Sequence, residues 1–179
     1  MPRFKQLRER TFVVKDHDEK IRSFPQRLDM RSVRMSRILL FSSLAAYLLC
    51  MLLPPYATDH GGQDQPNSIV LLLLGWFGIS AGYLEWLANP MLLVAWLSIA
   101  SYRHLSAVGS ALLAMGLSIV FSFRDSVITG ELDSLARVTE LKAGYWLWVV
   151  SAVFALSASV VQASPYIRRV LNLRRNSID

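Results

Sequence analysis

Long apolar runs separated by short polar stretches dominate the chain after residue 37. Residues 38–53 carry no charge and end at a Pro-Pro pair. A transmembrane helix needs about 20 residues, so we expect the first span to begin at Ser36. The runs at 107–123 and 144–163 predict two further spans. We expect the last one to close at Ser164-Pro165, because proline seldom continues a helix.

A fourth apolar stretch, residues 69–100, is interrupted. It holds 32 residues with one charge, Glu85, and one helix-breaking pair, Asn89-Pro90. It is too long for one span and too short for two spans with a loop. We therefore expect a half-length re-entrant or interfacial element over 69–82 and a true span over 85–102. Asn89 is expected to cap that span, with Pro90 at its first helical position.

The half-length element is rich in glycine, which lets helices approach closely. We expect it to pack against the 107–123 span at Gly109 and Gly116. Residues 124–142 mix acidic and basic side chains and predict a loop with room for one short amphipathic helix. The predicted fold class is therefore all-α. It is a polytopic membrane protein with four transmembrane helices plus one short re-entrant or interfacial helical element.

Charge is crowded into the two ends of the chain. Of the 19 Lys and Arg, eleven lie in residues 1–37 and four in 165–179, which leaves four in the 127 residues between. The loop at 54–68 carries no cation. Because cationic segments stay on the cytoplasmic side, both termini are predicted to be cytoplasmic and the loop at 54–68 to lie outside.

Three regions follow from this pattern. Residues 1–35 are predicted to form a basic, mostly flexible cytoplasmic tail, 36–164 a four-span membrane domain, and 165–179 a second basic cytoplasmic tail. Basic residues beside a membrane attract anionic lipid head groups, so the bilayer itself is the first expected partner. The high pI of about 9.8 comes from these tails, and we expect no nucleic-acid partner.

Few residues within the apolar region carry chemistry. Glu85 is the one carboxylate there, and an ionisable residue inside a membrane segment is a functional hypothesis by default. At an outer turn it also suits a structural role beside the start of a helix. The candidate functional surface comprises Trp76, Gly78, Gly82, Glu85, Trp86, Asn89 and Pro90, and the candidate inner turn comprises Arg103 and His104.

The motifs Gly75-Trp76, Trp86-Leu87-Ala88-Asn89-Pro90 and Gly144-Tyr145-Trp146-Leu147-Trp148 resemble those of a group of small, uncharacterised bacterial multi-span inner-membrane proteins. The shared pattern is a "WLANP" element and a "G-Y-x-L-W" last span, over residues 38–163. The resemblance implies a multi-pass protein of the bacterial cytoplasmic membrane and no defined activity. In size and predicted topology the chain also resembles immunity proteins against pore-forming bacteriocins.

No protease, hydrolase or nucleotide-binding motif is present in the sequence, so we expect no catalytic residues, no metal and no cofactor. The favoured function is a non-catalytic integral membrane protein, for example an accessory or immunity-like protein. It would act through helix packing with a partner protein or with itself as a homo-oligomer. The alternative is a small transporter or channel subunit that uses Glu85 and the helix break at Asn89-Pro90.

Overall fold

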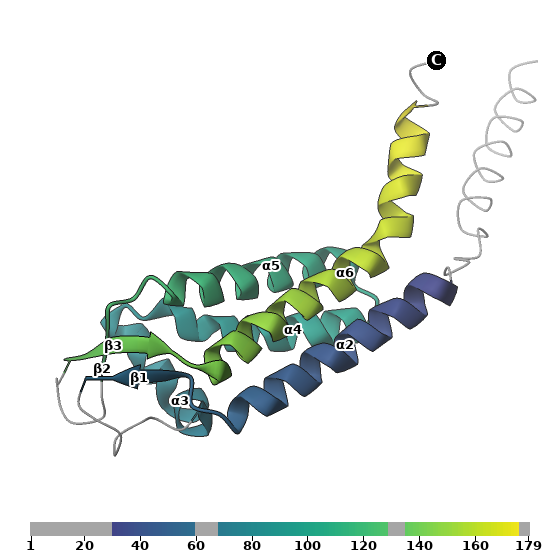
Figure 1. Ribbon diagram of the computed structural model, residues 1–179. Helices are drawn as coiled ribbons and strands as arrows, with labels where there is room; N and C mark the ends of the chain where they lie inside the picture. Colours follow the sequence, from purple (N-terminus) through teal and green to yellow (C-terminus); the bar gives the residue numbers. More distant parts are fainter. Residues whose placement is uncertain (1–29, 60–67, 129–134, 176–179) are drawn as a thin grey trace, which may run out of the picture.

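Four helices form a bundle in the computed structural model, which describes residues 30–59, 68–128 and 135–175 (Figure 1). They are α2 (Met30–Met51), α4 (Ala88–Ala100), α5 (His104–Phe121) and α6 (Ala143–Arg175). The shorter elements α3 (Ser68–Leu74), η1 (Gly75–Ala81) and η2 (Leu84–Leu87) lead into α4. The strands are β1 (Tyr56–Thr58), β2 (Ser126–Ile128) and β3 (Leu135–Leu141), and they lie at one end of the bundle.

Three of the described helices are long and apolar enough to cross a membrane: Met30–Met51, His104–Phe121 and Ala143–Ile167. They correspond to three of the four predicted spans. The predicted span over 85–102 forms a shorter apolar helix, Leu84–Ala100, and the half-length element forms another, Ser68–Ser80. The helix α2 begins at Met30, so residues 30–35 are helical, whereas the sequence placed them in the flexible tail. Residues 1–29 lie outside the described part.

Small residues fill the interior of the bundle. The main core cluster contains Leu92 and five alanines, which are Ala95, Ala111, Ala114, Ala152 and Ala155. Large apolar side chains point outward along all four helices, as Phe41, Leu97, Leu113 and Val153 illustrate. A water-soluble bundle has the opposite arrangement, with its large apolar residues inside. Small interior residues let helix backbones approach closely, as is typical of helix packing in lipid.

Serine hydroxyls join α2 to α6 along an antiparallel seam. The Ser43 hydroxyl donates to the Ser151 carbonyl at 2.7 Å, and the Ser151 hydroxyl donates to the Ser43 carbonyl at 2.9 Å. Further along, the Ser36 hydroxyl donates to the Ala158 carbonyl at 3.0 Å. The Trp96 indole of α4 donates to Ser43 at 2.9 Å. All three serines are buried, so these bonds satisfy polar groups that water cannot reach.

The mostly helical fold predicted from the sequence is confirmed, but the loop end of the bundle also forms strands that were not predicted. The strands form a three-stranded antiparallel sheet in the order β1-β3-β2. Tyr56 pairs with Leu141, and the β1–β3 register shifts between Ala57 and Thr58. Valine and threonine in the 135–141 segment favour strand over the predicted amphipathic helix. The strand β1 lies far from β3 in sequence, so the pairing of these two strands has no local signature.

The last helix does not close at Ser164-Pro165 as predicted. It continues through Pro165 to Arg175, and Figure 1 shows the end of α6 turning away from the bundle. Proline removes the N–H that would bond the carbonyl four residues earlier, and it kinks the helix. Here the Ser164 hydroxyl donates to that carbonyl, of Val161, at 3.0 Å. The freed acceptor is thereby satisfied and the helix continues.

Candidate functional site

The half-length element is built from α3 and η1 and folds against the turn that follows it. A Cβ at Gly75 would collide with the indole of Trp86, and one at Gly78 would lie 3.2 Å from the Cβ of Tyr83. A Cβ at Gly109 or at Gly116 would meet nothing within 4 Å. The predicted packing against α5 through those two glycines was therefore wrong, because aromatic side chains of the next turn occupy the space at the element's own glycines.

The turn between η1 and η2 needs a residue without a side chain. Gly82 caps η1 with φ of 85°, in the left-handed region, which glycine adopts without steric penalty. After this reversal, the Trp86 indole donates to the Leu72 carbonyl at 3.1 Å. Trp86 therefore ties η2 back onto α3. By contrast, Trp76 is 50% exposed and stacks on Phe77 with 3.9 Å between ring centroids.

Glu85 is buried and forms an ion pair with Arg124, at the end of α5. The Arg124 Nε lies 2.5 Å from Glu85 Oε1, and its Nη2 donates to the Gly82 carbonyl at 3.1 Å. The guanidinium also lies over the Tyr83 ring, 4.9 Å from its centroid. The hydrogen bond to Glu85 raises the pKa of Arg124 above its ordinary value. Glu85 Oε2 is buried and has no hydrogen-bond partner among the described residues.

Asn89 does not cap α4, contrary to the sequence prediction. The helix begins at Ala88, with Leu87 in the capping position and no side-chain capping bond. Asn89 Oδ1 instead accepts from the Tyr47 hydroxyl at 3.2 Å and from the Trp148 indole at 3.0 Å. These donors belong to α2 and α6, so the amide joins three helices. Pro90 lies in the first turn of α4, where the N–H groups need no helical partner.

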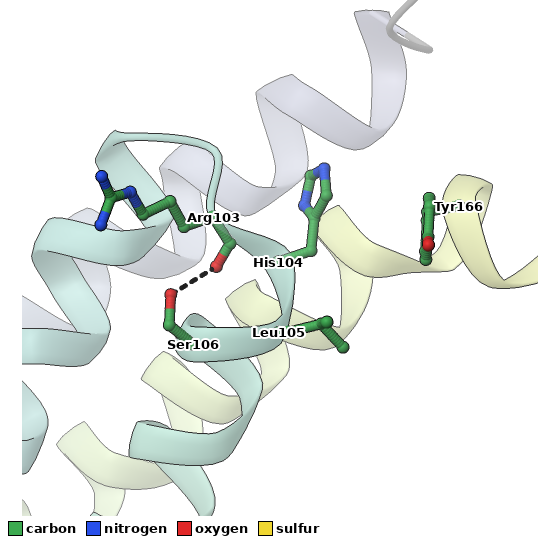
Figure 2. Close-up of a pocket in the computed structure, with 5 residues that line it drawn as sticks. All are labelled: Arg103, His104, Leu105, Ser106 and Tyr166. Atoms are coloured by element: carbon green, nitrogen blue, oxygen red, sulfur yellow. Dashed lines mark hydrogen bonds between the residues drawn. The ribbon is translucent and has the colours of Figure 1, made fainter.

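Arg103 and His104 lie at the opposite end of the bundle, in the turn between α4 and α5. They line a shallow open depression of about 400 Å³ with Leu105, Ser106 and Tyr166 (Figure 2). The rings of His104 and Tyr166 lie 6.3 Å apart. Figure 2 shows the Arg103 side chain directed away from both rings. The depression is thus a surface feature beside the bend of α6, and its side chains do not converge on one point.

The structure divides the candidate residues between the two ends of the bundle. Trp86, Glu85 and Gly82 meet in one compact turn beside the half-length element. Asn89 faces the interior, and Arg103 with His104 lies at the far end. Within the described ranges, no group of three or more His, Cys, Asp or Glu residues could hold a metal ion. What the sheet end offers chemically is one buried carboxylate, its arginine and an exposed aromatic surface.

Sequence reasoning missed the partners of the candidate residues. Arg124 is one of only four cations in the 127 central residues, and it directly follows a predicted span. The lone carboxylate of the apolar region was the signal that could have suggested this pairing. Tyr47 and Trp148 gave no such signal, because aromatic residues in a predicted span are ordinary.

Comparison with known proteins adds no relative. No family model, curated protein or solved structure matches the chain.

Proposed function

We propose that this chain is a multi-pass membrane protein in which α2, α4, α5 and α6 all cross the bilayer. Both termini would lie on the cytoplasmic side of a bacterial inner membrane. The observation that carries the proposal is the sorting of side chains, with alanine and serine buried and large apolar residues exposed along the helices. An exposed apolar surface of this extent is suited to lipid and not to water.

The fourth crossing rests on how α4 is connected. The 13 residues of α4 and the four of η2 extend over about 28 Å, close to the hydrocarbon thickness of about 30 Å. A short turn joins α4 to α5, and the Glu85–Arg124 pair joins their other ends. Two helices tied at both ends span the same depth. If α5 crosses the bilayer, α4 crosses with it.

Cysteine labelling tests this topology. In a Cys50→Ala background, Ser101→Cys and Asn172→Cys should react only from the cytoplasmic side, and Thr139→Cys on β3 only from the outside. Ser101 and Thr139 are both exposed, so accessibility alone does not separate them. Labelling of position 101 or 172 from the outside would disprove the four-span arrangement.

Within the membrane, the protein is proposed to act without catalysis, through contacts of its helices with a partner protein or a second copy. The half-length element is the proposed contact surface. Two neighbouring aromatic side chains of η1 are exposed, Trp76 at 50% and Phe77 at 58%. They lie on a 3-10 helix. Aromatic side chains are enriched at the core of protein contact surfaces. The exposed pair on η1 therefore suits contact with a partner protein or a second copy.

Site-specific photo-crosslinking tests the contact surface. A photoreactive residue in place of Phe77 should yield one discrete protein adduct in native membranes. The matched control is Leu113 on α5, which is 58% exposed as well and is expected to face lipid. Lipid adducts alone at both positions would refute the proposed surface, and an adduct of twice the chain's mass would identify the partner as a second copy.

The rival function is a small transporter or channel subunit, and the unpartnered Glu85 Oε2 is the observation in its favour. Against it, Asn89 Oδ1 already accepts two internal hydrogen bonds. Glu85→Gln separates the two functions, because the amide oxygen can still accept from Arg124. Crosslinking at position 77 should persist in this variant under the packing function. Under the transport function, the unaltered protein should carry a proton or solute flux in proteoliposomes. Loss of that flux in the Glu85→Gln variant would favour transport.

A further inference from the structure

Acidic side chains are confined to one end of the described bundle. The carboxylates of the described residues, Asp59, Glu85, Asp125 and Glu140, all lie at the sheet end. At the opposite end, Arg34 and Arg37 of α2 and Arg103 of the α4–α5 turn are exposed. No carboxylate among the described residues lies there to neutralise them. This end therefore complements an anionic surface.

The turn at this end carries a residue that its backbone disfavours. Tyr102 has φ of 56°, in the left-handed region. The Tyr102 N–H bonds the Ile99 carbonyl at 3.2 Å and the Arg103 N–H bonds the Ser98 carbonyl at 2.9 Å. These two bonds form a Schellman ending, in which the left-handed position is usually glycine. A strained residue kept at such a position points to a use for its side chain.

That side chain brings two distant segments together. Arg37 Nη2 donates to the Tyr102 hydroxyl at 3.0 Å across 65 residues of sequence. The bond uses one of the five N–H donors of the guanidinium, and the phenol keeps its own hydrogen to donate. Arg103 follows Tyr102 directly. Tyr102 and Arg103 belong to the same turn, so two guanidinium groups and one hydroxyl lie at this end of the bundle, a donor set that suits phosphate oxygens.

We infer that Arg37, Tyr102 and Arg103 form a binding site for the phosphate head group of an anionic phospholipid. The inference rests on the proposed membrane insertion. Exposed apolar residues flank the site, Ile38 on α2 and Leu105 on α5, at 50% and 83% exposure. Acyl chains would contact these residues while the head group contacts the cations. A soluble phosphate compound would make no use of that apolar rim.

Native mass spectrometry of the full chain, titrated with phosphatidylglycerol or with phosphatidylcholine of the same acyl chains, tests this site. Phosphatidylglycerol should bind preferentially. Each arginine near an anionic lipid contributes about fivefold, so Arg37→Gln with Arg103→Gln should lower the preference about 25-fold. The matched control is Arg137→Gln, which removes an exposed cation at the sheet end and should leave the preference unchanged.

Tyr102→Gly separates lipid binding from folding. Glycine relieves the backbone strain, so this variant should be at least as stable in neutral detergent, yet it should show a reduced preference for phosphatidylglycerol. A preference that survives the double arginine variant, or that falls equally in Arg137→Gln, would overturn the site. Competition by inorganic phosphate at equal concentration would reassign it to a small soluble anion. Failure of the chain to enter lipid nanodiscs would instead overturn the proposed membrane insertion.

Discussion

At the scale of single residues, the glycines differ in whether a neighbouring segment lies too close for a side chain to fit. Gly144 is the second residue of α6 and lies against the α2–β1 connection. A Cβ there would lie 2.6 Å from the Leu53 carbonyl oxygen and 2.7 Å from that of Pro54. Gly116 faces open space. The two positions look alike in sequence, since both are small residues in apolar helices. Only Gly144 is required by a close backbone approach.

Gly144→Ala should therefore lower the free energy of unfolding by about 1–3 kcal/mol, because the backbone must shift to admit the methyl group. Gly116→Ala is the control and should raise the free energy of unfolding by about 0.5–1 kcal/mol, the ordinary gain for alanine in a helix. Denaturation in mixed micelles, followed by tryptophan fluorescence, measures both. Equal effects of the two substitutions would show that the connection at Pro54 does not pack on α6.

Tyr56 gives the sheet end a dependence on alkaline pH. Its side chain is buried at 4% exposure, its ring centroid lies 5.8 Å from that of Phe121, and burial raises the pKa of the phenol to about 12. The unfolded phenol ionises near pH 10, so the folded state holds its proton more tightly. The contribution of this phenol to the free energy of unfolding is fully present below about pH 10, and it is lost as the pH rises to about 12.

The expected loss is on the order of 2 kcal/mol, measured as the change in unfolding free energy between these pH values. Tyr56→Phe cannot ionise and should show a smaller decline over the same window. Ultraviolet absorbance of tyrosinate reports the titration directly. An equal decline in both proteins would place the alkaline sensitivity in another group.

At the scale of elements, α6 shows how a helix continues through proline. The Ser164 hydroxyl occupies the Val161 carbonyl that the N–H of residue 165 would otherwise bond. The sequence pair Ser-Pro predicted a stop. In the structure, the serine supplies the donor that the proline lacks. The helix bends and continues, and its end turns away from the bundle.

A double-mutant cycle should reveal this coupling. Ser164→Ala alone leaves the Val161 carbonyl without a donor and should cost about 1–3 kcal/mol of unfolding free energy. Combined with Pro165→Ala, the same change should cost little, because the new backbone N–H bonds that carbonyl. The difference between the two effects is the coupling energy. Additive effects would mean that the serine does not compensate for the proline.

At the scale of the whole molecule, the bundle is held by close approach of small residues rather than by a large apolar core. Ala155 of α6 is fully buried in the main core cluster, whereas Val153, two residues earlier, is 43% exposed. If the exposed face is in lipid, a larger apolar residue on that face leaves the helix packing unchanged. The same residue in the bundle interior disrupts the packing. Volume added within a packed interior displaces neighbouring helices.

Ala155→Leu should therefore lower the free energy of unfolding by about 1–3 kcal/mol, and Val153→Leu should change it little. Thermal unfolding of the protein in lipid nanodiscs compares the two. A large loss for Val153→Leu would indicate that this face of α6 contacts another protein, and not lipid.

The amino-acid sequence by itself determined the helical segments and the segregation of charge. In an apolar environment each backbone N–H and C=O must bond within its own segment, so an uncharged run predicts a helix without knowledge of its neighbours. Three of the four predicted spans are helices of sufficient length and hydropathy. The half-length element also lies where it was predicted, as the apolar helix Ser68–Ser80.

Only the tertiary structure decided which groups meet. Glu85 pairs with Arg124 across 39 residues, and Asn89 joins Tyr47 and Trp148 from two other helices. Tyr56 pairs with Leu141 in a sheet that no local pattern indicated. Each of these contacts depends on the distance between segments after folding. A hydropathy pattern records the preference of each residue for lipid or water, but it carries no information on that distance.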